Sequence, residues 1–151
     1  MADQPEEKRR IVVGVDGSES SGRALRWAVR QAELTGSALV AVIAWEYPTY
    51  HGARGWFPPA GTDEAALESR ARQEVARAVE RAVGEDPPVE VRTEARYGTP
   101  AGALVEASRG AELLVVGSRG LGGFAGMLLG SVAQHCTRHA TVPVVVVRGG
   151  E

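Results

Sequence analysis

The chain has 151 residues, of which 44% are hydrophobic and 24% charged, a composition typical of one folded globular domain. Its formal net charge of −2 gives no support to nucleic-acid binding, and its single cysteine, Cys136, excludes an internal disulfide framework. The polar segment 1–10 is not followed by the apolar h-region of a signal peptide, and every apolar run is far too short to cross a bilayer. We therefore expect a cytoplasmic protein with no nucleic-acid or membrane partner.

The first part of the chain alternates strand-like and helix-like patterns. Residues 1–8 are predicted to be a disordered tail. Residues 11–15 are rich in β-branched side chains and predict a strand, and a helix is expected from about residue 18 to the stop signal Gly36. Residues 38–45 are apolar at consecutive positions, as in a parallel strand that is covered on both faces.

The segment 46–61 interrupts this alternation, because prolines, glycines and aromatic residues are mixed in it, and it predicts a long mobile loop. A helix is then expected from Thr62 or Asp63 to about residue 83, followed by a half-exposed strand at 89–95 near a sheet edge. Pro100 suits the first turn of a further helix, which ends near Gly110. The remaining expected elements are a buried strand at 113–116, a helix at 131–139 and a fifth strand at 143–147.

Strict alternation of strands and helices predicts an α/β fold with a doubly wound, five-stranded parallel sheet and helices on both faces. The expected strand order is 3-2-1-4-5. No internal repeat and no shift in composition marks a second domain, so we expect a single domain over residues 9–148.

The segment after the fourth expected strand is unusually rich in glycine. Residues 117–130 contain six glycines and lead directly into the helix that starts near Ser131. Glycines allow backbone N–H groups to approach phosphate oxygens closely, and the dipole of the following helix favours an anion at its N-terminus. Asp16, which follows the first strand, is expected at the same edge of the sheet. This arrangement predicts a phosphate site in which Ser131 is the N-cap of the helix.

A plain surface loop, a dinucleotide fingerprint and a Walker A loop all fit these glycines less well. A flexible surface loop would tolerate these glycines, but it would not explain why they stand between a strand and the start of a helix. Residues 120–125 fit the dinucleotide pattern G-x-G-x-x-A, yet they follow the fourth strand and lack the acidic residue about 20 positions further on. A Walker A loop is excluded, because no lysine precedes Ser131.

The spacing Gly117-x2-Gly120-x9-Gly130-Ser131 resembles the ATP-binding signature of the universal stress protein family. Three further segments agree with it: Val-Gly-Val-Asp-Gly-Ser at 13–18, Tyr-Gly-Thr-Pro at 97–100 and the closing Pro-Val-Val-Val-Val at 143–147. The resemblance covers nearly all of residues 9–148. Two positions depart from the family pattern, since Ala44 stands where valine is frequent and Arg119 where histidine can occur.

The resemblance implies ATP as the ligand, with or without Mg²⁺. It places Asp16 near the ribose and adenine, frames the base with residues of the first two strands, and assigns the ribose and phosphates to the glycine turn and the helix after it. The positions implied to contact the nucleotide are Gly14, Val15, Asp16, Ala44, Val116, Gly117, Arg119, Gly120, Gly130, Ser131 and Val132. It also implies a homodimer through the fifth strand, and the uncharged run Val144, Val145, Val146, Val147 supports this independently as an edge that needs a partner.

Several residues also allow simpler roles. Asp16 suits an N-cap of the following helix, and a capping carboxylate keeps one oxygen for a ligand. Arg119 is either a solvated loop residue or a phosphate contact. His135, Cys136 and His139 invite comparison with a metal site, but few other ligands exist in the chain, so we expect a surface histidine pair and no metal.

The sequence thus predicts an ATP-binding stress-response regulator that acts on an unknown downstream protein through nucleotide occupancy and dimer state. No catalytic residues are expected, because a phosphate-binding lysine, a second carboxylate for Mg²⁺ and a water-activating residue are missing from the turn. Slow hydrolysis, or autophosphorylation at a serine such as Ser131, remains compatible. Two alternatives stay open: an adenylate-forming enzyme, which residues 15–18 match poorly, and a nucleotide-independent interaction module.

Overall fold

The computed structural model describes residues 9–47, 50–52, 55–57, 63–119 and 129–149. The expected tail at residues 1–8 lies outside this part of the chain. The elements are β1 (Arg10–Gly14), α1 (Glu19–Thr35), β2 (Ala38–Trp45), β3 (Tyr50–Gly52), β4 (Gly55–Phe57), α2 (Glu64–Val83), β5 (Val91–Tyr97), α3 (Pro100–Ala107), β6 (Leu113–Gly117), α4 (Ser131–His139) and β7 (Val144–Val147).

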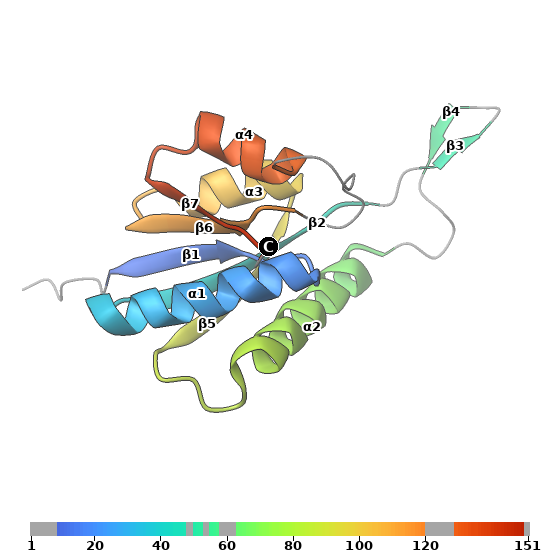
Figure 1. Ribbon diagram of the computed structural model, residues 1–151. Coiled ribbons are helices and arrows are strands. Elements are labelled where there is room, and N and C mark those ends of the chain that lie inside the picture. Colours follow the sequence, from blue (N-terminus) through green and yellow to red (C-terminus); the bar gives the residue numbers. More distant parts are fainter. Residues whose placement is uncertain (1–8, 48–49, 53–54, 58–62, 120–128, 150–151) are drawn as a thin grey trace, which may run out of the picture.

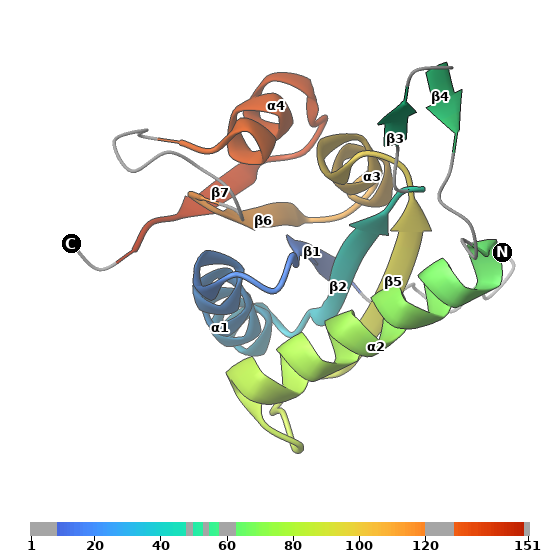
Figure 2. The ribbon, with the colours of Figure 1, turned by 90° about the vertical axis from the view of Figure 1, so that its right-hand side faces the viewer.

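The main sheet has five parallel strands in the order β5-β2-β1-β6-β7. Counted along the chain, this is the predicted order 3-2-1-4-5, so the predicted fold class and strand order are confirmed. Figures 1 and 2 show α1 and α2 on one face of the sheet and α3 and α4 on the other. Strands β1, β2 and β6 lie between these two helical layers, which explains their continuous apolar runs.

The hydrophobic core consists of two clusters, one on each face of the sheet. Alternate residues of one strand belong to different clusters: Ile11 and Val13 of β1 pack toward α1 and α2, whereas Val12 packs toward α3 and α4. Leu25 and Val75 contribute the centre of the first cluster from their helices, and both are fully buried. Because both faces are packed, the strand ends are held rigidly relative to one another.

The helix N-termini exclude one of the roles left open for Asp16 and contradict the predicted cap of α4. The N-cap of α1 is Ser18, whose hydroxyl accepts the Ser21 N–H at 3.2 Å, so Asp16 is not the cap. The N-cap of α4 is Gly130, with φ −70° and ψ 166°, and Ser131 is the first helical residue, so the expected cap role of Ser131 is wrong. The Gly130 N–H donates to the Ser118 carbonyl at 2.6 Å, and this bond holds Gly130 in the extended conformation of an N-cap. The cap therefore lies one residue before the predicted position.

Part of the expected loop at 46–61 forms regular structure. Strands β3 and β4 pair antiparallel, with Tyr50 opposite Phe57 and Gly52 opposite Gly55, and they form a second, separate sheet. The aromatic residues favour strands, but the neighbouring prolines and glycines are typical of loops, so the segment was predicted to be a loop. That the segment is mobile stays a prediction. Among the described helices, none is both long enough and apolar enough to cross a membrane.

Candidate nucleotide-binding site

The C-terminal ends of β1 and β6 meet at the point where the strand order reverses. From β1 the chain continues to β2 and β5 on one side, and β6 and β7 occupy the other side. Figure 2 views the sheet toward these ends. Val13 is paired with Val115 of β6, and Gly14 with Val42 of β2, so the turns after β1 and β6 lie side by side. Such a reversal is where parallel sheets bind ligands.

Asp16 lies in the turn between β1 and α1. Its Oδ1 accepts the Ser18 N–H at 2.8 Å, and its own N–H donates to the Ser21 hydroxyl at 3.3 Å. These bonds fix the backbone of the turn and hold the carboxylate beside the end of β1. Asp16 therefore orders the turn instead of capping the helix, while its predicted contact with a ribose stays a prediction.

The two ends of the glycine turn are joined by Ser118. Its N–H donates to the Val147 carbonyl at 3.0 Å, and its carbonyl accepts the Gly130 N–H at 2.6 Å. Ser118 is buried, so these bonds are protected from water. The start of the turn is thereby tied to β7 and to the N-terminus of α4. The sequence did not indicate this role, because the partners are distant along the chain.

Ser20, in the first turn of α1, is a second residue that the sequence did not indicate. It is buried, and its hydroxyl accepts the Arg119 N–H at 3.2 Å. A Cβ atom at Gly117 would lie within 2.8 Å of the Ser20 carbonyl carbon and oxygen. Gly117 is therefore required for α1 to approach the end of β6, a packing reason separate from phosphate binding.

Gly14 has a similar packing reason on the opposite face of the sheet. A Cβ atom there would lie 2.6 Å from a methyl group of Leu104 in α3. Leu104 is buried in the second core cluster together with Val116. Gly14 thus allows α3 to pack against the end of β1, and its proposed place under an adenine stays a prediction.

The N-terminus of α4 faces the same edge and differs from those of the other described helices. Ser18, Asp63 and Thr99 each cap their helix with a side-chain oxygen, whereas Gly130 provides no such cap. Ser131 is exposed, and Val132 packs against the second cluster. A helix terminus without a side-chain cap leaves first-turn N–H groups for an external acceptor, and an anion is the acceptor that the helix dipole favours.

The structure thus brings most of the predicted contact residues to one edge of the sheet. Those positions are Val15 and Asp16 after β1, Ala44 in β2, Val116 and Gly117 in β6, Arg119 after β6, and Gly130, Ser131 and Val132 at the start of α4. The Arg119 side chain is exposed, and Ala44 is half-buried. Gly120 lies outside the described residues. The contacts of all these positions with a nucleotide stay predictions.

An aromatic cluster stands beside Ala44 at the ends of β2 and β5. Trp45, Tyr47 and Tyr97 make mutual edge-to-face contacts, with ring centroids 5.1 to 5.9 Å apart. The Tyr47 hydroxyl donates to the Glu64 carboxylate at 3.1 Å. At least Tyr47 of the aromatic segment therefore packs on the domain itself, although Tyr97 remains largely exposed.

His135, Cys136 and His139 do not come together on one face of α4. The two histidines are exposed, with ring centroids 4.4 Å apart, whereas Cys136 is fully buried on the core side. Burial raises the pKa of the Cys136 thiol to about 11, so the thiol is protonated near neutral pH and is a poor metal ligand. Among the described residues, no group of three or more potential ligands is suited to a metal ion.

Comparison with known proteins identifies the family. The sequence model that describes the universal stress protein family matches residues 8–148. The chain belongs to this family. A universal stress protein of Mycolicibacterium smegmatis is 33% identical over 93% of the chain, and universal stress protein Rv2623 of Mycobacterium tuberculosis is 37% identical over 91%. The chain spans only 48% and 44%, respectively, of these two relatives.

Solved structures of universal stress proteins have the same fold. One of them, a universal stress protein in complex with cAMP, is 28% identical, with a TM-score of 0.64 over 95% of this chain and 98% of its own. UspA from Lactobacillus plantarum is 22% identical, with a TM-score of 0.69 over 94% of this chain and 99% of its own. The second likeness bears on the fold alone.

Proposed function

We propose that this universal stress protein binds ATP at the C-terminal edge of its sheet and acts as a stress-response regulator whose state depends on nucleotide occupancy. The observation that carries the proposal is the N-terminus of α4, which lacks a side-chain cap and begins where the glycine turn closes on Ser118. Phosphate oxygens are suitable acceptors for its first-turn N–H groups. The Ser131 hydroxyl is available to donate as well.

The adenosine end of the ligand would lie toward β1 and β2. Asp16 offers a carboxylate to ribose hydroxyls, and the half-buried Ala44 offers a small apolar surface to the base. The neighbour in complex with cAMP supports an adenine nucleotide in a protein of this fold. ATP, with or without Mg²⁺, suits the site better than a nucleoside, because the turn and the helix terminus need charged oxygens to bind.

The regulatory part of the proposal includes a homodimer through β7. This strand is at the edge of the sheet, is paired with β6 alone among the described strands, and consists of four half-buried valines. Its outer backbone groups need hydrogen-bond partners, and a twofold-related β7 would provide them. Occupancy and dimer state would then be read by a downstream protein.

Calorimetric titration of ATP into wild-type protein and the Gly130→Val variant tests the proposal. Gly130 is buried, and its φ of −70° is one that valine adopts, so the backbone conformation does not oppose the variant, while its branched Cβ would crowd the backbone that phosphates must approach. We expect at least about a tenfold loss of affinity, the cost of one charge-assisted hydrogen bond. Thr137→Val, at an exposed position further along α4, is the matched control. Unchanged affinity in Gly130→Val would exclude this site.

A further inference from the structure

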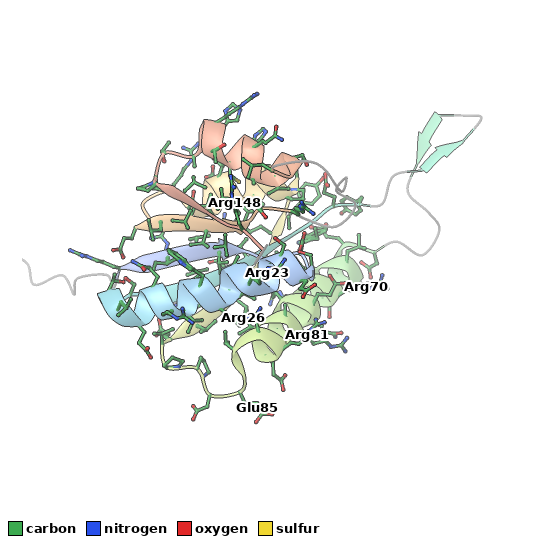
Figure 3. All side chains as sticks on the ribbon, viewed as in Figure 1. Arg23, Arg26, Arg70, Arg81, Glu85 and Arg148 are labelled. Atoms are coloured by element: carbon green, nitrogen blue, oxygen red, sulfur yellow. The ribbon has the colours of Figure 1, made fainter. Side chains whose placement is uncertain are left out.

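A cavity of about 360 Å³ lies between α1 and α2, on the other face of the sheet from α4. The first two turns of α1 and the turn before them form one side, and Ala78, Arg81 and Ala82 of α2 form the other. Figure 3 labels Arg26 of α1 and Arg81 of α2, the two cations of its lining. The volume falls in the range of pockets that hold small molecules.

The two arginines outnumber the one carboxylate of the lining, so the lining carries a net positive charge. In the part of the chain that the structure describes, neither Arg26 nor Arg81 makes an ion pair or a side-chain hydrogen bond. The one carboxylate of the lining belongs to Glu19, and it lies 3.5 Å from Arg23, a residue outside the lining. Arg26 and Arg81 are both exposed, and they line one cavity together with a single carboxylate, that of Glu19.

The remaining lining residues are small: Gly17, Gly22, Ala78 and Ala82, together with Ser18 and Ser21. A Cβ atom at Gly22 would meet only the Arg26 Nη1, at 3.7 Å, so this guanidinium lies over the glycine at the cavity. Ala78 and Ala82 supply methyl groups from α2, with Ala78 buried and Ala82 half-buried. A ligand for this space combines a compact apolar body with a strongly anionic end.

We propose that this cavity is a binding site for a small soluble phosphate monoester, held by Arg26 and Arg81. A phosphate monoester is close to a dianion at neutral pH and has three acceptor oxygens, which match the two cations and their forked N–H donors. A carboxylate would neutralise only one of the two guanidinium groups. No residue of α4 or of the glycine turn lines this cavity, although Gly17 and Ser18 of its lining directly follow Asp16 of the nucleotide site.

An NMR titration with phenyl phosphate tests the proposal on the intact chain. We expect saturable amide shifts centred on Gly17, Gly22 and Ala78, and none from phenol, which has the same apolar body without the charge. The double variant Arg26→Gln, Arg81→Gln should raise the dissociation constant about tenfold or more. The matched control is Arg30→Gln, Arg77→Gln, which removes two cations of the same helices that are exposed like Arg26 and Arg81 but do not line the cavity, and it should leave affinity within about twofold.

The Gly130→Val variant separates this site from the nucleotide site. Phenyl phosphate should bind Gly130→Val as it binds the wild type, whether or not ATP binds at α4. Loss of phenyl phosphate binding in Gly130→Val, with retention in the Arg26, Arg81 double variant, would overturn the proposal. If both double variants weakened phenyl phosphate binding equally, the effect would come from net charge alone, and this result would also overturn the proposal. Binding only to vesicles that contain phosphatidic acid would contradict a soluble ligand.

Discussion

The hydroxyl of Ser20 in α1 accepts a hydrogen bond from Arg119 at the start of the glycine turn. Replacing Ser20 therefore tests how far the order of the turn depends on α1. Ser20→Ala would leave the Arg119 N–H without its acceptor. We expect a loss of about 0.5–1.5 kcal/mol in the free energy of unfolding, together with weaker ATP binding because the turn is less ordered. Urea unfolding and calorimetry measure the two effects.

Ser108→Ala is the control for Ser20→Ala. Ser108 is also buried, and its hydroxyl donates to the Val105 carbonyl at 2.9 Å, at the far end of α3. Its loss should cost similar stability without changing ATP affinity. If the two variants bound ATP equally well, Ser20 would have no part in ordering the site.

Substitution by alanine is expected to change the free energy of unfolding in opposite directions at Gly117 and at Gly22. Gly117→Ala would place a Cβ within 2.8 Å of the Ser20 backbone, so we expect a loss of about 1–3 kcal/mol in the free energy of unfolding. At Gly22, inside a helix, a Cβ would make only an ordinary contact with the Arg26 Nη1 at 3.7 Å, so Gly22→Ala should raise the free energy of unfolding by about 0.5–1 kcal/mol. Denaturant titration of both variants decides; a neutral Gly117→Ala would remove the packing reason for that glycine.

Among the elements, β7 carries the prediction about assembly. The carbonyls of Pro143 and Val147 accept N–H groups of β6 and of the residue after it, and alternation along a parallel strand then points the N–H groups of Val144 and Val146 outward. Val146→Pro removes an outward donor, so it should convert the proposed dimer to a monomer while the fold is kept. Light scattering at tens of micromolar protein measures this, with Val146→Ile as control. A proline variant that stays dimeric would place the interface elsewhere.

The elements also show which features a sequence can predict. The run at 38–45 and the helix at 131–139 were predicted with the bounds that the structure has, because burial on both faces and helical periodicity are local signals. The short strands β3 and β4 were missed, since prolines and glycines dominate their surroundings. The cap of α4 was misplaced by one residue, because a hydrogen bond from Gly130 to Ser118 decides it, and that bond depends on the tertiary fold.

At the scale of the whole molecule, the strand order determines where a ligand can bind. Alternation of elements predicts the parallel sheet, and the expected order 3-2-1-4-5, which the structure has, places the turns after β1 and β6 side by side. The residues that join those turns, Ser20 and Ser118, could not be predicted. The partner of Ser20 lies 99 positions away in the sequence, and nothing local marks either serine. The sequence therefore located the candidate site but not the contacts that support it.

Binding of ATP to the folded protein is the central claim, and thermal unfolding with and without millimolar ATP tests it most directly. A ligand at about 100 times its dissociation constant stabilises the native state by roughly 2.7 kcal/mol. For a chain of this length we expect the melting temperature to rise by about 5–10 °C, and Gly130→Val, with at least about a tenfold loss of affinity, should show at most about half of this rise. An unchanged melting temperature in wild-type protein, with no heat in calorimetry at the same ATP concentration, would contradict the proposed function.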